Sequence, residues 1–162
     1  MSLHAEFKHA LAATPPFHLE RLEPRLVEAA HGDLRVQCQM AALDSLGCEF
    51  TSLVVEAPRL RNASIEQLKE LAGQLATRLT YLLEPISPVE FDADHCLVQM
   101  RSTPPQKDDD LTSYYELLVS REGNLSLCRY SRPRGSVRTI VPAQVTREVL
   151  LRLVRDFSAA AA

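Results

Sequence analysis

The stretch from residue 112 to residue 131, TSYYELLVSREGNLSLCRYS, predicts a β-hairpin and sets the register of the strands around it. With residues 121–123 as a three-residue loop, Gly123 takes the left-handed backbone conformation that such a loop requires. This register gives four cross-strand pairs: Val119 with Leu125, Leu117 with Leu127, Tyr115 with Arg129, and Tyr114 with Tyr130. One face of the hairpin is therefore aliphatic and ends in a tyrosine beside an arginine.

The first half of the chain predicts a three-stranded meander over residues 25–56. Residues 34–40, LRVQCQM, alternate between apolar and polar side chains, which is typical of a half-buried strand. Turn signals at residues 31–33 and 44–47 flank this strand. The apolar alternation changes phase once after Phe50, as a β-bulge would cause.

A long helix is predicted over residues 64–84, between the two groups of strands. Ser64 and Gln67 form a capping box, and Pro85 stops the helix. One stripe contains the apolar residues, which recur at three and four: Ile65, Leu68, Leu71, Ala72, Leu75, Leu79, Leu82 and Leu83. We therefore expect this helix to form the main wall of the core, with Leu75 buried at its centre.

The order of elements predicts one α+β domain over residues 1–162: a curved antiparallel sheet of about six strands in two meanders, with a long central helix and terminal helices on one face. The predicted segments are an N-terminal helix with a Pro-rich connection (1–16), the first meander (25–56), the long helix (64–84), the second meander (88–141) and a C-terminal helix capped by Thr146 (146–158).

This element order, helix-βββ-helix-βββ(β)-helix, is similar to that of bacterial type III secretion chaperones, which are small, acidic and dimeric. The resemblance covers most of the chain and lies in the topology, since no sequence motif is shared. A likeness of topology does not carry a function by itself. We expect a homodimer because an open sheet of six strands leaves exposed edge strands. The strand at residues 34–40 is the candidate for pairing between copies, because neither proline nor lysine guards it.

Composition indicates a globular cytoplasmic protein. The 162 residues are 46% hydrophobic and 24% charged, and no run of about 18 apolar residues could span a membrane. The N-terminus lacks the pattern of a secretory signal. Four cysteines lie far apart without zinc-binding spacing, so we expect free thiols: Cys38, Cys48, Cys96 and Cys128.

Positive charge concentrates near the end of the chain, although the net charge is −3. Residues 121–162 carry 8 basic and 3 acidic side chains, whereas residues 1–120 carry 10 basic and 18 acidic ones. The segment RYSRPRGSVR at 129–138 holds four arginines. The candidate binding residues are Arg129, Arg132, Arg134, Arg138, Tyr115 and Tyr130.

We expect Arg129 to lie over the ring of Tyr115, and Arg132, Arg134 and Arg138 to be exposed without such a partner. Three interpretations remain for this segment. It is a solvated loop that pairs with the chain's own acidic groups such as residues 108–110, a surface that binds an acidic protein, or a site for phosphate or nucleic acid. The acidic balance of the whole chain argues against nucleic acid.

No motif for catalysis, a metal or a cofactor is present. The chain lacks the sequence patterns of serine hydrolases, zinc proteases, P-loops and dinucleotide-binding folds. Asp92, Asp94 and His95 have the chemistry of a weak cation site, with the two carboxylates on one strand face. We assign no catalytic residue, metal site or cofactor on this basis.

The sequence thus favours a non-enzymatic module for protein–protein interaction, which would act as an adaptor or as a chaperone-like protein. Two alternatives stay open. One is a small-molecule or anion-binding domain that uses the arginine-rich segment 129–138, and the other is an enzyme without a recognisable motif. A deep polar pocket with convergent side chains would favour either alternative, and a flat surface with an apolar patch on the long helix or an edge strand would favour the module.

Overall fold

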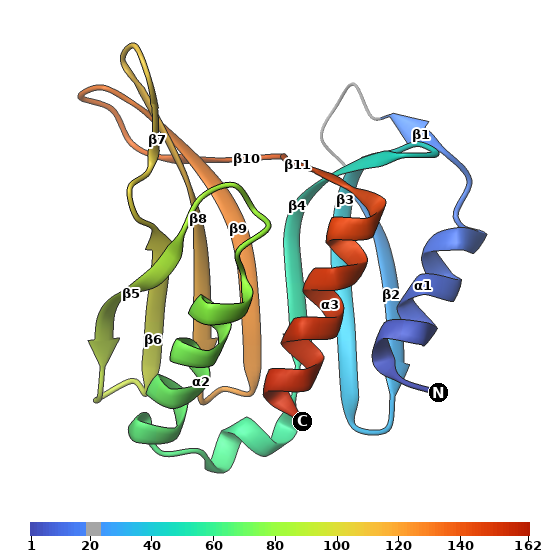
Figure 1. The fold of residues 1–162 in the computed structure, drawn as a ribbon, viewed down its shortest axis with the longest axis horizontal. Coiled ribbons are helices and arrows are strands. Elements are labelled where there is room, and N and C mark those ends of the chain that lie inside the picture. Colours follow the sequence, from blue (N-terminus) through green and yellow to red (C-terminus); the bar gives the residue numbers. More distant parts are fainter. Residues whose placement is uncertain (19–23) are drawn as a thin grey trace.

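A computed structural model describes residues 1–18 and 24–162 and shows an α+β fold in which the three α-helices cover one face of an antiparallel sheet (Figure 1). The helical segments are α1 (Leu3–Ala13), the 3-10 helix η1 (Pro58–Asn62), α2 (Ile65–Arg78) and α3 (Arg147–Ala161). The strands are β1 (Phe17–His18), β2 (Arg25–His31), β3 (Leu34–Leu43), β4 (Gly47–Glu56), β5 (Ile86–Asp92), β6 (Leu97–Ser102), β7 (Gln106–Asp108), β8 (Leu111–Ser120), β9 (Asn124–Pro133), β10 (Thr139–Val141) and β11 (Ala143–Thr146).

The predicted order of helices and strands is confirmed, but the sheet holds more strands than the six expected. Within residues 1–18 and 24–162 it has eleven strands, whose main path is β1-β3-β4-β9-β8-β6-β5. The strands β1, β7, β10 and β11 have two to four residues each, too few to show an alternating pattern. The second meander begins at Ile86, two residues earlier than predicted.

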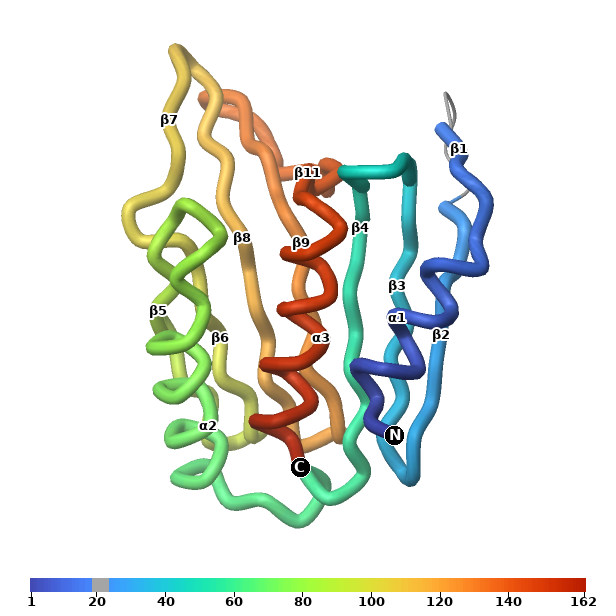
Figure 2. Tube along the Cα trace, turned by 45° about the vertical axis from the view of Figure 1, so that its right-hand side comes forward, coloured from blue at the N-terminus to red at the C-terminus, as the bar shows by residue number. Residues whose placement is uncertain are grey.

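The last strands of the two halves, β4 and β9, lie side by side at the centre of the sheet. Leu53 of β4 pairs with Leu127 of β9, and Val55 pairs with Leu125. Near Gly47, β4 pairs instead with β11, and the far part of β9 pairs with β10. Figure 2 shows that all three α-helices lie on the same side of this sheet, so no helix of residues 1–18 or 24–162 covers its other face, called the open face below.

The hairpin of β8 and β9 has the register predicted from its sequence. Ser120 pairs with Asn124, which leaves residues 121–123 as the loop, and Gly123 has a φ of +104°. All four predicted cross-strand pairs are present, with no register shift between Leu111 and Ser120. Successive side chains of β8 and β9 therefore point to opposite faces of the sheet along the whole hairpin.

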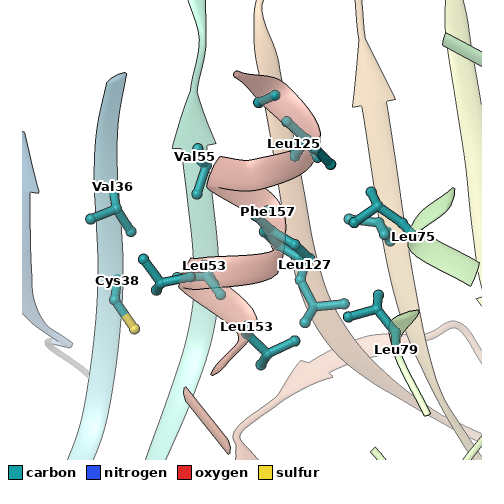
Figure 3. Close-up of a cluster of buried hydrophobic side chains, with 14 of the residues drawn as sticks. Val36, Cys38, Leu53, Val55, Leu75, Leu79, Leu125, Leu127, Leu153 and Phe157 are labelled. Atoms are coloured by element: carbon teal, nitrogen blue, oxygen red, sulfur yellow. The ribbon is translucent and has the colours of Figure 1, made fainter. Parts of the chain in front are cut away.

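The core lies between the helices and the sheet. Figure 3 shows Leu153 and Phe157 of α3 against side chains of β4 and β9, with Leu75 and Leu79 beside them. Leu75 is fully buried, as predicted. The apolar stripe of α2 and the inward positions of the central strands thus meet in one hydrophobic cluster.

The long helix is shorter than the prediction of 64–84. The capping box of Ser64 and Gln67 is present, but α2 ends at Arg78. Leu79 and Leu82 are still buried, because the chain that follows the helix folds back over the same core. Leucines at helical spacing therefore indicated burial correctly at Leu79 and Leu82, although neither is in the helix. The prediction was wrong at Leu83, which has a left-handed φ of +65° and a side chain that is 96% exposed.

The C-terminal helix runs to Ala161, three residues past the predicted end at 158. Ala160 and Ala161 are buried, and the side chain of Arg59 donates to both of their carbonyl oxygens. Basic side chains that bond the last carbonyls stabilise a helix end. This contact comes from a residue about 100 positions away, so local sequence could not predict it.

The strand at residues 34–40 is not an edge, contrary to the prediction. It belongs to β3, which pairs with β2 on one side and β4 on the other. The pairing of β3 with β4 shifts register around Met40, which confirms a bulge in this pair. No strand of residues 1–18 or 24–162 pairs with the outer edge of β2 or of β5.

Across the described residues, no helix combines the length and the apolar character needed to cross a membrane.

Replacement of Leu75 by alanine should lower the free energy of unfolding by about 2–5 kcal/mol, the range for removing a buried leucine. Chemical denaturation would measure this loss. The matched control is Gln74→Ala on the exposed side of the same turn, which should change stability by less than about 0.5 kcal/mol. A loss below about 0.5 kcal/mol for Leu75→Ala would contradict the placement of α2 against the core.

Candidate functional site

The structure divides the six predicted binding residues between the two faces of the sheet. Tyr115 and Arg129 lie on the helix side, in the same alternation as Leu117 and Leu127. Tyr130 and Arg138 lie on the open face, and Arg132 and Arg134 are exposed near the end of β9. The arginine-rich segment therefore does not build one continuous cationic site.

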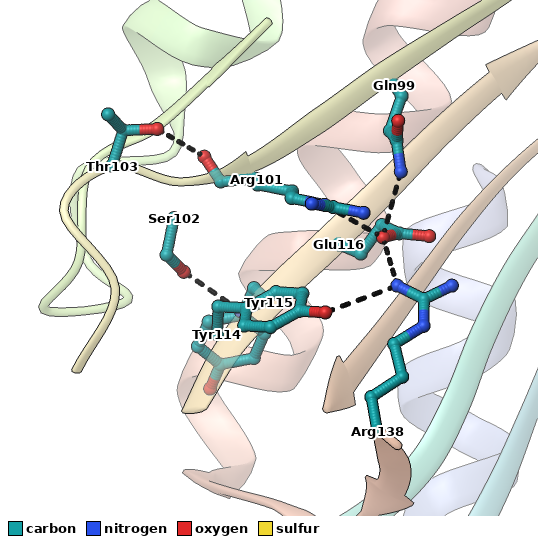
Figure 4. Close-up of polar contacts among 8 residues, drawn as sticks. All are labelled: Gln99, Arg101, Ser102, Thr103, Tyr114, Tyr115, Glu116 and Arg138. Atoms are coloured by element: carbon teal, nitrogen blue, oxygen red, sulfur yellow. Dashed lines mark hydrogen bonds and ion pairs between the residues drawn. The ribbon is translucent and has the colours of Figure 1, made fainter. Parts of the chain in front are cut away.

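On the open face, the carboxylate of Glu116 holds together a polar cluster (Figure 4). Its Oε2 atom accepts hydrogen bonds from Gln99 at 3.0 Å, Arg101 at 3.1 Å and Arg138 at 2.6 Å. Arg138 also donates to the hydroxyl of Tyr114 at 3.3 Å. The donors come from β6 and from the turn before β10, and both acceptors lie on β8, so the cluster ties three parts of the sheet together.

Glu116 is charged in this setting although its side chain is only 4% exposed. Burial acts to raise the pKa of Glu116, but hydrogen bonds from Arg138, Gln99 and Arg101 and the charge of Arg138 outweigh it and lower the pKa overall. The bond to Glu116 in turn raises the pKa of Arg138. Two guanidinium groups share one carboxylate, so the cluster keeps a net positive charge.

The two tyrosines of the open face form a platform for the guanidinium groups. The rings of Tyr114 and Tyr130 are 6.0 Å apart, as expected for their cross-strand pairing. Arg138 lies 3.9 Å above the ring of Tyr130, and Arg101 lies 5.2 Å from that of Tyr114. Stacking of this kind fixes the flat guanidinium groups in place.

Arg138 corrects one prediction, since it was expected to have no partner. Its side chain is 37% exposed, but it bonds to Glu116 and Tyr114 and stacks on Tyr130. The reason is the strand β10, which returns along β9 and brings residue 138 over the open face. The fold of the turn, which local sequence does not encode, supplies this contact.

The end of the β8–β9 hairpin presents both charge and apolar surface. Arg134 lies 3.9 Å from Asp110, and both side chains are at least 80% exposed. Val137 and Ile140 are 79% and 52% exposed, and Leu111 is 41% exposed. The predicted proximity of this segment to the acidic loop at 108–110 is thus found for Arg134, as a loose surface contact of little energy.

On the helix side, Arg129 lies over Tyr115 as predicted, at 4.7 Å from the ring centre. It also lies 3.0 Å from the carboxylate of Glu84 and donates to Gln106 at 2.9 Å. Both charged side chains are largely buried, with 12% and 15% exposure. They form the floor of a cavity of about 610 Å³ between the α2–β5 connection and the strands.

The sequence prediction missed the two carboxylates that organise these arginines. Glu116 was detectable in part, because the predicted register places it on the same face as Tyr114 and Tyr130. Glu84 was assigned to the long helix, so nothing in the sequence indicated its contact with Arg129. Gln99, Arg101 and Gln106 lie on other strands, and only the tertiary structure brings them in.

The carboxylates of Asp92 and Asp94 do not share a strand face, because β5 ends at Asp92 and a turn follows. Asp92 instead contacts the ring of His95 at 2.7 Å and accepts from its backbone N–H. In the part of the chain that is described, no three of the His, Cys, Asp and Glu side chains gather as metal ligands would.

All four cysteines are free, as predicted. Burial raises the pKa of Cys48 to about 12 and that of Cys38 well above its usual value. These two thiols therefore stay protonated at neutral pH and are poor nucleophiles.

Comparison with known proteins found no matching family model, no matching curated protein and no matching solved structure. The geometry of the molecule is therefore the basis for its functional assignment.

Replacement of Glu116 by glutamine should flatten the acid side of the pH–stability profile. The lowered pKa of Glu116 means that its stabilisation is complete above about pH 4.3, the value in an unfolded chain, and is lost as pH falls through the folded-state pKa. Urea unfolding of both proteins from about pH 7 to about pH 3 would measure it. The stability difference should shrink below about pH 4.3; a difference independent of pH would refute the charged role of Glu116.

Proposed function

We propose that this protein is a non-enzymatic protein-binding module and that its contact surface is the open face at the end of the β8–β9 hairpin. The observation that carries the proposal is the Tyr130–Arg138 stack. The exposed Ile140 pairs with Tyr130 across β10 and β9, and the exposed Val137 directly precedes Arg138 in the chain. Tyrosine and arginine dominate the energetics of protein interfaces, and an exposed apolar patch is a common mark of a binding site.

The stack is also held in place before any partner arrives. Glu116 and Tyr114 fix the guanidinium of Arg138, and the cross-strand pairing fixes Tyr130. Side chains that are already ordered lose little conformational entropy on binding, so more of the contact energy appears as affinity. The buried carboxylate thus supports the surface without being part of it.

The charge of this surface favours an acidic protein partner. The cluster around Glu116 keeps a net positive charge, and Arg132 is exposed at the end of β9, whereas the charge of Arg134 is offset by Asp110 of the acidic loop. A small anion would need several donors that converge in a concave site. Here the arginines are divided between two faces and an exposed turn, which suits an extended contact better than a pocket for phosphate.

The module is also proposed to work as a cytoplasmic homodimer. Strand β5 contains Pro88 and a register shift, both of which oppose pairing of its outer edge with another chain. Strand β2 contains neither proline nor lysine, so its outer edge lacks these obstacles. Unpaired strands without such guards are the usual sites of pairing between chains. The four free cysteines fit a reducing compartment.

To test the binding surface, Val137 and Ile140 would both be replaced by aspartate and the protein used for affinity capture from a lysate of the source organism. We expect the captured partner to be lost, because two charges now face it, while the unfolding midpoint stays within the range of surface substitutions. Capture by the wild type should weaken as salt rises, since the surface is cationic.

The matched control is Leu46→Asp with Val89→Asp, two side chains with nearly the same exposure, 80% and 49%, that lie on other elements. This variant should retain the partner. An identical captured set for all three proteins would mean that binding does not involve this face.

For the dimer, light scattering at micromolar concentration should give twice the mass of one chain. Leu26→Lys combined with Ala30→Lys, both on exposed positions of β2, should give a monomer, because lysines on an edge strand oppose pairing. A monomeric wild type would remove the homodimer from the proposal.

A further inference from the structure

The acidic loop at residues 108–110 lies directly against the turn that follows β9. The backbone N–H of Arg134 donates to the carbonyl oxygen of Asp110 at 2.7 Å, and Leu111, the next residue, pairs with Pro133. Beyond the end of the sheet the two segments project together, beside β7 (Figure 1). The backbone of the acidic loop is therefore fixed next to the arginine-rich segment.

The acidic loop is also short and well defined. Strand β7 ends at Asp108 and β8 begins at Leu111, so Asp109 and Asp110 form a two-residue turn. Asp109 has a left-handed φ of +50°, which aspartate adopts more readily than most residues. The hairpin thus keeps the three aspartates close to the arginines.

The loop offsets most of the positive charge at this end of the molecule. Residues 107–110 and 132–138 carry four basic and three acidic side chains, all on exposed residues. The basic ones are Lys107, Arg132, Arg134 and Arg138, and the acidic ones are Asp108, Asp109 and Asp110. Exposed charges act on one another over about 8 Å at physiological ionic strength, so the loop weakens the attraction of this end for an acidic partner.

Asp110 is the member of the loop that contacts an arginine. Its Oδ1 atom lies 3.9 Å from Nη1 of Arg134, and both side chains are at least 80% exposed. A pair between exposed groups is weak, so another carboxylate can replace Asp110. The pair is intramolecular, however, and such contacts act at effective concentrations in the millimolar range. A single carboxylate in solution would therefore compete poorly, whereas a surface with several carboxylates would displace Asp110.

We propose that the acidic loop is an autoinhibitory element of the open-face surface: Asp110 occupies Arg134 and has to be displaced before an acidic partner can use this arginine. The inference rests on the proposed function, because it concerns the regulation of the same surface. The contact lowers the affinity for weakly charged surfaces. It thus selects partners that present several carboxylates together.

The test measures binding of fluorescently labelled poly-L-glutamate by anisotropy, at neutral pH and about 10 mM salt, where screening is weak. Asp110→Asn should bind the probe about threefold to fivefold more tightly than the wild type, the factor that corresponds to one exposed ion pair at about 4 Å. Asparagine keeps the size of the side chain and leaves the backbone bond to Arg134 in place. The gain should disappear at about 1 M salt.

The matched control is Asp108→Asn, which removes the same charge from the same loop. Asp108 pairs with Leu111, which alternates with Tyr115 and so lies on the helix side. This variant should change the affinity by less than about twofold. In an Arg134→Gln background Asp110→Asn should give no gain, whereas in an Arg132→Gln background the gain should remain.

Equal gains for Asp108→Asn and Asp110→Asn, or a gain that persists without Arg134, would overturn the proposal, because the loop would then act only through its overall charge. Failure of Asp110→Asn to strengthen binding would also overturn it. The capture experiment with the Val137 and Ile140 variant is independent of these results. A partner lost by that variant, without a gain from Asp110→Asn, would leave the binding surface and remove the autoinhibition, and a gain without a captured partner would do the reverse.

Discussion

The unbroken antiparallel register of β8 and β9 is the constraint on which the rest of the molecule depends. Because successive side chains of a strand point to opposite faces, one register assigns every residue of both strands to the core or to the open face. Leu117 and Leu127 enter the core, and Tyr115 and Arg129 continue that face toward the cavity of about 610 Å³. Glu116 lies on the open face. A slip of one residue would exchange the two faces and remove both the core and the cluster.

The carboxylates of Glu84 and Glu116 hold arginine side chains in fixed positions on the two faces of the sheet. Glu84 takes Arg129 on the helix side, and Glu116 takes Arg138 and Arg101 on the open face. Arg129 and Arg138 therefore have fixed partners, whereas Arg132 and Arg134 are exposed. Arg101, Arg129 and Arg138 each stack on a tyrosine, which gives each of them one defined orientation.

The covering of only one face by helices leaves the open face as surface. That face carries tyrosine, arginine, glutamine and a half-buried cysteine, Cys128, rather than a continuous aliphatic layer. Antiparallel sheets tolerate such a solvated face. On this face the hydrogen bonds to Glu116 hold the neighbouring side chains in place of a hydrophobic core. The proposed binding surface includes one of these side chains, that of Arg138.

The sequence by itself determined the order of elements, the hairpin register, the helix caps and most buried positions, because these follow from local turn chemistry and from apolar periodicity. It placed Arg129 over Tyr115 for the same reason, since the two are cross-strand neighbours. Only the tertiary structure decided the end of α2 and the contacts of Glu84 and Glu116 with their arginines. The interior position of β3 follows instead from local pairing with β2 and β4, which the predicted meander already implied. Glu84 and Glu116 meet arginines that are distant in the sequence, and no pattern along the chain records which distant charge a buried carboxylate will meet.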